Sequence, residues 1–160
     1  RRIDDGMLST HFENKNLRDL LVSIGEKNRV RANIKGIDIM YSLREVMLTT
    51  DIELLKEIIE NLLTNAIKFS PGVALVDVTI LAAGNSVSVR VKDYGIGIPE
   101  DDLRNLFEPF FRGGNVNAIQ GTGLGLSIIR KSLDLLKGTI TVDSTPGKGT
   151  EFHVTIPIHA

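Results

Sequence analysis

The chain has 160 residues, of which 42% are hydrophobic and 24% are charged, a balance that fits one soluble globular domain and not a disordered chain. Its formal net charge of −1 supplies no field for nucleic acid or an anionic membrane, so we expect direct contact with neither. The absence of cysteine excludes a disulfide, a thiolate metal site and a cysteine nucleophile, and is compatible with a reducing cytoplasmic setting. No apolar run reaches about 20 residues, the length of a membrane span.

The first part of the chain predicts strands around one helix. Residues 7–13 are expected to form a short strand. Asn16 offers a side-chain oxygen to cap a helix that runs to about residue 32. Residues 37–42 and 45–49 are the next strand candidates.

The second predicted helix has the strongest periodicity. Asp51 is placed to cap its start, and Pro71-Gly72 ends the pattern. Its apolar stripe consists of Leu55, Ile58, Ile59, Leu62, Leu63, Ala66 and Ile67.

A β-hairpin is predicted next, because two runs alternate between apolar and polar residues on either side of a Gly84-Asn85 turn. The alternating apolar residues are Val76, Val78 and Ile80, then Val87, Val89 and Val91. A short helix fits residues 100–106.

The remaining chain predicts a loop, a helix and a second hairpin. The segment from Arg112 to Gln120 has little hydrophobic pattern and is a candidate lid. A helix from about residue 123 is expected to end with Gly138 as its C-cap. The hairpin has strands 139–144 and 150–157, joined through Pro146-Gly147-Lys148-Gly149.

These elements predict an α+β fold. Runs of strands separated by single helices favour a mixed, largely antiparallel sheet covered on one face by about three helices. The expected architecture is therefore a two-layer α/β sandwich.

Three polar residues share one face of the second predicted helix. Asn61, Asn65 and Lys68 are spaced four and three apart, so they flank the apolar stripe together. An amide oxygen suits Mg²⁺ that is already held by phosphates, and a lysine one turn away can neutralise those phosphates. The alternative is an ordinary solvated flank of the helix.

Asp93 has the same strand parity as Val87, Val89 and Val91, which predicts an inward-facing carboxylate. Burying an unpaired charge is costly, so a ligand that brings a donor, such as the exocyclic amine of adenine, would bind selectively. Gly95 and Gly97 let the chain turn sharply and allow a ring to approach the backbone. The alternative is that the strand ends earlier and Asp93 begins a turn.

The segment Gly121-Thr122-Gly123-Leu124-Gly125-Leu126 places glycines every second residue where a helix begins. Backbone N–H groups and the positive end of the helix dipole can there face a polyphosphate. A flexible loop without a ligand has the same composition. The segment has neither the Gly-Lys-Ser/Thr of a P-loop nor the parallel strand of a dinucleotide fingerprint.

Phe107, Phe110 and Phe111, followed by Arg112, lie next to the candidate lid. They are either simple core or apolar anchors for the base of a mobile loop, with Arg112 in reach of phosphate. His11, His153 and His159 show no metal-ligand spacing and receive no catalytic role.

Together these motifs resemble the catalytic ATP-binding domain of sensor histidine kinases, of the gyrase, mismatch-repair and histidine-kinase ATPase superfamily with the Bergerat fold. Five motifs carry the resemblance in the family's order and spacing, over about residues 8–157. They are the N box from Asn61 to Phe69, the glycine boxes at Asp93-x-Gly95-x-Gly97 and Gly121-x-Gly123-x-Gly125, the F box Phe107-x-x-Phe110-Phe111, and Gly147-Lys-Gly149-Thr150.

The resemblance implies a role for each motif. Asp93 would bind the adenine amine with Thr150, which shares the inward parity of Phe152, Val154 and Ile156. Asn65 would ligate Mg²⁺, while Asn61, Lys68 and Arg112 would lie along the phosphates as the catalytic residues. The implied nucleotide contacts also include Phe69, Gly95, Gly97, Ile98, Phe110, Gly121, Thr122, Gly123, Leu124, Gly125 and Leu126. Residues 112–122 would be the ATP lid.

One position separates the subclasses of the superfamily. The ATPase branches have a water-activating Glu one turn before the metal-binding Asn, where this chain has Asn61, which cannot serve as a base near neutral pH. Glu57 and Glu60 are poor substitutes, because Glu57 lies a further turn back and Glu60 points elsewhere. The resemblance therefore favours a protein-histidine kinase that aligns ATP for an external nucleophile.

The expected acceptor histidine lies outside this chain. His11-Phe12-Glu13 falls in a strand-like stretch, so we do not assign it as the acceptor. Residues 1–7 resemble the tail of a preceding dimerisation hairpin helix, and residues 8–160 the catalytic domain. Expected partners are that phosphoacceptor domain and a downstream response regulator, with the isolated domain monomeric. A non-catalytic ATP-binding switch and a serine kinase of the same superfamily stay open as alternatives.

Overall fold

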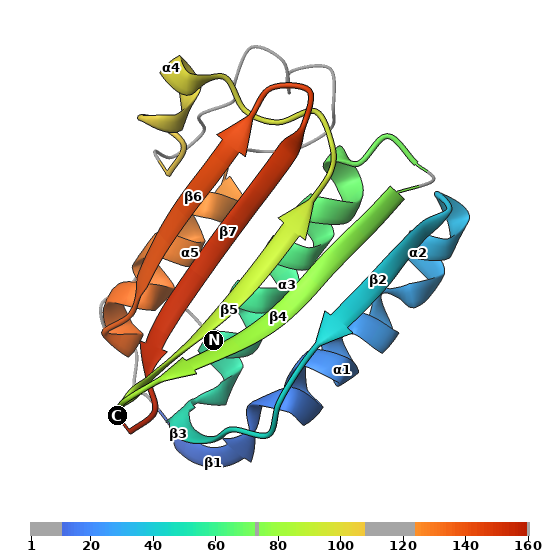
Figure 1. Cartoon of the computed structure of the whole chain (residues 1–160). Helices are drawn as coiled ribbons and strands as arrows, with labels where there is room; N and C mark the ends of the chain where they lie inside the picture. The colour runs from blue at the N-terminus through green and yellow to red at the C-terminus, as the bar shows by residue number, and fades with distance from the viewer. Residues whose placement is uncertain (1–10, 73, 108–123, 160) are drawn as a thin grey trace.

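The computed structural model describes residues 11–72, 74–107 and 124–159, without the side chains of residues 124 and 125. Five strands form one sheet in the order β2-β4-β5-β7-β6, and α1, α2, α3 and α5 lie along one of its faces (Figure 1). Only the β2–β4 pair is parallel; the other three pairs are antiparallel. The predicted two-layer sandwich with a mixed, largely antiparallel sheet is confirmed.

The first described strand belongs to a small two-stranded ribbon that is separate from the main sheet. β1 (Phe12–Asn16) pairs antiparallel with β3 (Met47–Asp51). The first strand was expected at residues 7–13, but in the described part of the chain it continues to Asn16, directly before the helix. The ribbon is tied to the end of the chain by a hydrogen bond from Thr49 N to Ile158 O of 2.8 Å.

The first predicted helix is two helices, α1 (Leu17–Lys27) and α2 (Arg29–Ile34). Asn16 caps the first as expected, since its Oδ1 accepts from the N–H of Arg18 at 3.0 Å. Asn28 interrupts the run, because its Nδ2 donates to the carbonyl of Ile24 at 2.9 Å and its φ and ψ of −100° and 4° leave the helical range. The single helix to residue 32 was therefore wrong at this point.

The central helix α3 (Ile52–Phe69) agrees with its predicted stripe and cap. The Oδ1 of Asp51 accepts from the N–H of Leu54 at 3.2 Å. All seven stripe residues are at most 3% exposed and pack into the core under the sheet. This burial is the main force that fixes α3 against the strands.

The middle of the sheet is the predicted hairpin, β4 (Ala74–Ala83) and β5 (Ser86–Asp93), with β2 (Ile37–Ser42) beside β4. In β5 every second residue is buried, which confirms the alternation read from the sequence. Helices cover one face of the sheet alone (Figure 1), and the β5 residues that alternate with the buried ones are polar and half-buried, namely Ser86, Ser88, Arg90 and Lys92.

The last elements are α4 (Glu100–Leu103), α5 (Leu124–Leu136), β6 (Thr139–Thr145) and β7 (Gly149–Pro157). α4 is shorter than the helix expected at 100–106. No described helix is long and apolar enough to cross a membrane.

The end of α5 differs from the expected glycine cap. Lys137, with a φ of 60°, takes the left-handed conformation, and the N–H of Gly138 donates to the carbonyl of Leu133 at 2.8 Å. Gly138 is needed for space instead, because a Cβ there would lie 2.7 Å from the carbonyl oxygen of Thr155.

Candidate nucleotide-binding site

Asp93 is the last residue of β5 and is a buried carboxylate. It is 5% exposed, and the apolar residues of the same parity, Val89 and Val91, are each 1% exposed. The predicted inward parity is therefore confirmed, and the alternative in which the strand ends before Asp93 is wrong. The Asp93 carboxylate therefore lies at the edge of the apolar layer between the sheet and the helices.

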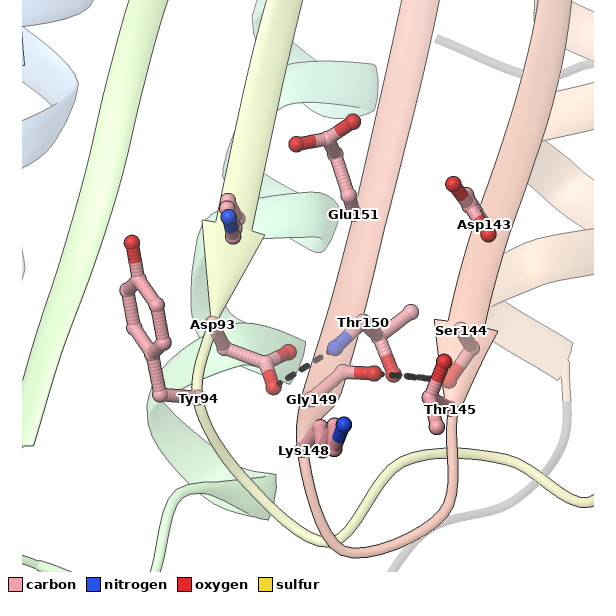
Figure 2. Close-up of a pocket in the computed structure, with 10 residues that line it drawn as sticks. Asp93, Tyr94, Asp143, Ser144, Thr145, Lys148, Gly149, Thr150 and Glu151 are labelled. Carbon is pink, nitrogen blue, oxygen red and sulfur yellow. Dashed lines mark hydrogen bonds between the residues drawn. The ribbon is translucent and has the colours of Figure 1, made fainter.

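Two backbone donors hold the Asp93 carboxylate by a single oxygen. Its Oδ1 accepts from the N–H of Gly95 at 2.9 Å. It also accepts from the N–H of Thr150, on the neighbouring strand, at 3.2 Å (Figure 2). Burial raises the pKa of the Asp93 carboxyl above its ordinary value, and these two donors oppose that rise only in part. The ionised group gains from any further donor that a ligand brings.

The glycines after Asp93 allow close approach of backbone to backbone. A Cβ on Gly95 would overlap the carbonyl oxygen of Phe69, the last residue of α3. Gly97 has a φ of 74°, and a Cβ there would overlap the backbone of Thr145 at the end of β6. Both glycines are therefore needed for packing between elements that are distant in sequence, whereas the predicted approach of a ligand ring to this backbone stays a prediction.

The β6–β7 turn interlocks with the loop after β5. The N–H of Gly147 donates to the carbonyl of Ile96 at 2.7 Å, and the N–H of Ile98 donates to the Ser144 hydroxyl at 2.8 Å. Gly149 has a φ of 126° and lies directly against the backbone of Asp93. The predicted hairpin is thus held against the carboxylate, where Thr150, 6% exposed, faces inward as expected.

Asn61, Asn65 and Lys68 lie on one side of α3 as predicted. Both asparagines are half-buried and Lys68 is exposed. None of their side chains makes a hydrogen bond or ion pair within the described parts of the chain, so two amides and an ammonium are available to a ligand. Such unengaged groups beside a buried stripe fit a polyphosphate and a cation.

Lys35, which sequence reasoning missed, caps the C-terminal end of α3. Its Nζ donates to the carbonyls of Ile67, Lys68 and Ser70 at 2.8, 3.0 and 2.6 Å. A cation at this end satisfies orphan carbonyls and complements the helix dipole. The contact joins residues more than 30 positions apart, so no local sequence signal could have revealed it.

The acidic residue directly before Asn61 is engaged elsewhere. Glu60 forms an ion pair with Lys27 of α1, with Nζ and Oε1 3.1 Å apart. The expectation that Glu60 points away from the polar face of α3 is confirmed. It is not placed to act as a base beside Asn65.

These groups gather at one end of the sandwich. In Figure 1 the end of β5, the β6–β7 turn, the C-terminal end of α3 and the beginning of α5 all lie at the same end of the sheet. The positive end of the α5 dipole is therefore at the same end as Asp93.

A cavity of about 480 Å³ borders the carboxylate end of this region (Figure 2). Asp93, Ser144 and Thr150 line it, together with residues of the uncovered sheet face such as Lys92 and Glu151. None of the three polar residues of α3 is among the described residues that line it. The cavity therefore marks the region near Asp93 and does not include the polar side of α3.

Several predicted site residues lie outside the described residues: Phe110, Phe111, Arg112, Gly121, Thr122 and Gly123. The same holds for the side chains of Leu124 and Gly125. Phe107 and Leu126 are half-buried and pack against the core. The guanidinium of Arg130 on α5 lies 5.4 Å from the centre of the Phe107 ring, so Phe107 links the α4 region to α5.

Residues 50–160 match the family described as histidine kinase-, DNA gyrase B-, and HSP90-like ATPases. The chain belongs to this family. Sensor histidine kinase RcsC of Escherichia coli strain K12 is 44% identical over 116 residues, which cover 71% of this chain but only 12% of RcsC.

The chain is also similar to solved structures of histidine kinases. Full-length ShkA in complex with AMPPNP is 28% identical with a TM-score of 0.87, over 98% of this chain and 33% of ShkA. A nucleotide-free catalytic domain of histidine kinase ThkA is 28% identical with a TM-score of 0.84, over 94% of this chain and 97% of that domain. The resemblance to an ATP-binding domain of sensor histidine kinases is confirmed, and a kinase role is supported.

Proposed function

We propose that this domain binds Mg-ATP and donates the γ-phosphate to a histidine on a dimerisation and phosphoacceptor domain outside the chain. The observation that carries the proposal is the buried Asp93 carboxylate, held on one oxygen at a strand end beside Gly95 and Thr150. A carboxylate that is largely desolvated favours a ligand with N–H donors, and the adenine amine supplies two.

The phosphate end of the nucleotide would lie along α3. Asn65 would supply an amide oxygen to the metal, and Lys68 would neutralise phosphate charge, with Asn61 beside them. The fit rests on side chains that are half-buried or exposed and unengaged by other described residues. When bound, Mg²⁺ would supply charge neutralisation between the phosphates. The first turn of α5, with Leu124 and Gly125, would direct its N–H groups at the same phosphates.

The identity of residue 61 favours transfer over hydrolysis. An asparagine cannot take a proton from water at neutral pH, and Glu60 is held by Lys27. A site that positions Mg-ATP without a base leaves the γ-phosphate for a nucleophile brought by a partner. The imidazole of a histidine needs no base, because its neutral form already carries a free electron pair.

The remaining assignments follow from the same proposal. Residues 8–160 would form the catalytic domain, residues 1–7 would continue a preceding hairpin helix, and a response regulator would receive the phosphate downstream in the cytoplasm. Arg112 would contact phosphate from the lid at residues 112–122. The other proposed nucleotide contacts are Phe69, Gly97, Ile98, Phe110, Gly121, Thr122, Gly123 and Leu126.

The test is transfer from ATP labelled on its γ-phosphate, with and without the dimeric hairpin domain of the parent protein. We expect label on the hairpin only, bound in an acid-labile form as phosphohistidine is. The Asn65→Ala variant is the matched control, because it removes the proposed metal ligand from a half-buried position on α3, and it should lose transfer while remaining folded.

Other outcomes separate the alternatives. Label on the 160-residue chain alone would contradict the proposal. Acid-stable label on the partner would indicate a serine kinase. Nucleotide binding without any transfer to the hairpin would indicate a switch module.

A further inference from the structure

Ser144, near the end of β6, joins three parts of the site through one hydroxyl group. Its Oγ lies 2.8 Å from the N of Ile98, 2.9 Å from the carbonyl oxygen of Gly149 and 2.8 Å from Oγ1 of Thr150. Figure 2 shows Ser144 beside Thr150 and Gly149, at the border of the cavity near Asp93. Sequence reasoning gave this serine no role.

The direction of each of these hydrogen bonds follows from the number of protons available. The N–H of Ile98 can only donate, so it occupies one lone pair of Ser144. The carbonyl of Gly149 can only accept, so it takes the single proton of Ser144. The remaining contact therefore requires Thr150 to donate its own proton to the second lone pair of Ser144.

This arrangement fixes the polarity of Thr150. Because its proton is used by Ser144, its Oγ1 can offer only lone pairs to a ligand. Asp93, 5% exposed beside it, is also an acceptor. Two acceptors with little access to water match the 6-amino group of adenine, whereas the 6-oxo group of a purine would meet acceptors on both sides.

We propose that Ser144 is a positioning residue that keeps Thr150 an acceptor and thereby selects 6-amino over 6-oxo purine nucleotides. The inference rests on the proposed function, because it assumes that the base lies against Asp93 and Thr150. Removing the Ser144 hydroxyl releases the Thr150 proton, which can then turn toward a 6-oxo group.

The experiment compares the affinities of the 160-residue chain for ATP and inosine triphosphate, two nucleotides that differ in the 6-position of the base. The wild-type chain is expected to favour ATP. Ser144→Ala should reduce the ratio of the affinity for ATP to that for inosine triphosphate by about tenfold. In this variant the Thr150 hydroxyl can donate to the 6-oxo group, so a repulsive contact between two acceptors becomes a hydrogen bond. Ser144→Thr retains a hydroxyl and should restore most of the ratio.

Ser88→Ala is the matched control. Ser88 Oγ lies 2.7 Å from Oγ1 of Thr155, a contact of the same type between β5 and β7 but away from Asp93. This variant should keep the wild-type ratio. Its stability change reports what the loss of such a cross-strand contact does alone.

The outcomes separate this inference from the function on which it rests. An unchanged ratio in folded Ser144→Ala would overturn the role of Ser144 while leaving ATP binding intact. If that variant does not fold, Thr150→Val, which removes the acceptor oxygen, should lower the ratio by about tenfold, and an unchanged ratio would again overturn the inference. A wild-type chain that binds neither nucleotide would overturn the proposed function itself.

Discussion

Gly95 lies directly against the carbonyl oxygen of Phe69, so that no Cβ fits between them. Gly95 follows the carboxylate at the end of β5, and Phe69 is the last residue of α3. This contact sets the distance between the two halves of the proposed site, the base end at Asp93 and the phosphate end on α3. The close approach of the loop after β5 to α3 is possible because Gly95 has no side chain.

Replacing Gly95 with alanine should therefore push the loop after β5 away from α3. We expect ATP affinity to fall by at least about tenfold and the free energy of unfolding to fall by about 1–3 kcal/mol, the usual result of overpacking. Calorimetric titration and chemical denaturation measure the two effects. Gly84→Ala is the control, since that glycine, with a φ of 58°, has open space around it in the β4–β5 turn. ATP affinity as low in Gly84→Ala as in Gly95→Ala would contradict this account.

Lys35→Met should destabilise the chain by about 1.5–3 kcal/mol, because three carbonyls at the end of α3 lose a charged donor. Lys27→Met is the comparison. It removes an ion pair between side chains that are 59% and 30% exposed, and should cost less than about 1 kcal/mol. Urea denaturation measures the free energy of unfolding of both variants. An equal loss of stability in the two would contradict the larger contribution that we assign to the Lys35 cap.

Asn61→Glu should increase ATP hydrolysis by roughly tenfold, since it places a carboxylate where a general base can act, though without the alignment of an evolved site. Release of inorganic phosphate is the measurement. Asn61→Gln has the same size without the charge and should stay at the wild-type rate. If the glutamate variant binds ATP but hydrolyses no faster, residue 61 is not the reason for the poor hydrolysis that we expect of the wild-type chain.

The periodic elements were predictable from local pattern. Alternation in β5 and β7 correctly placed Asp93 and Thr150 on the inward face, because burial enforces a two-residue period. Asp51 and Asn16 were recognisable as caps, since the capping bond spans only two or three residues.

What could not be predicted depends on contacts between distant residues. Lys35 reaches carbonyls 32 to 35 residues away, and Ser144 bonds to Ile98, 46 residues away. The interruption at Asn28 arises from competition between its side chain and the helix ladder, which helical periodicity does not encode. The site is thus recognisable from its motifs, but the groups that support those motifs emerge only from the fold.

Asp93→Asn should make the ligand-free chain more stable at neutral pH. Burial raises the folded-state pKa of this carboxyl above its unfolded-state value, so stability falls as the pH rises through the interval between them. An amide oxygen can still accept from Gly95 and Thr150 without carrying the charge. The higher stability of Asp93→Asn relative to wild type should be present at pH 7. It should vanish below about pH 4, the ordinary pKa range of an aspartate, where the carboxyl is protonated in both the folded and the unfolded chain. Denaturation midpoints across this pH range test it, and a variant less stable than wild type at pH 7 would contradict it.

The most direct test of the central claim, that Asp93 recognises adenine, is calorimetric titration of ATP into wild type and Asp93→Asn at neutral pH. Cooperative denaturation of both proteins in the stability measurement described above is the check that both are folded. We predict that the wild-type chain binds ATP and that the affinity of the variant for ATP is lower by at least about a hundredfold. The neutral amide in Asp93→Asn lacks the negative charge that strengthens the hydrogen bond from the base to the Asp93 carboxylate. Equal affinity in the two proteins would contradict the account.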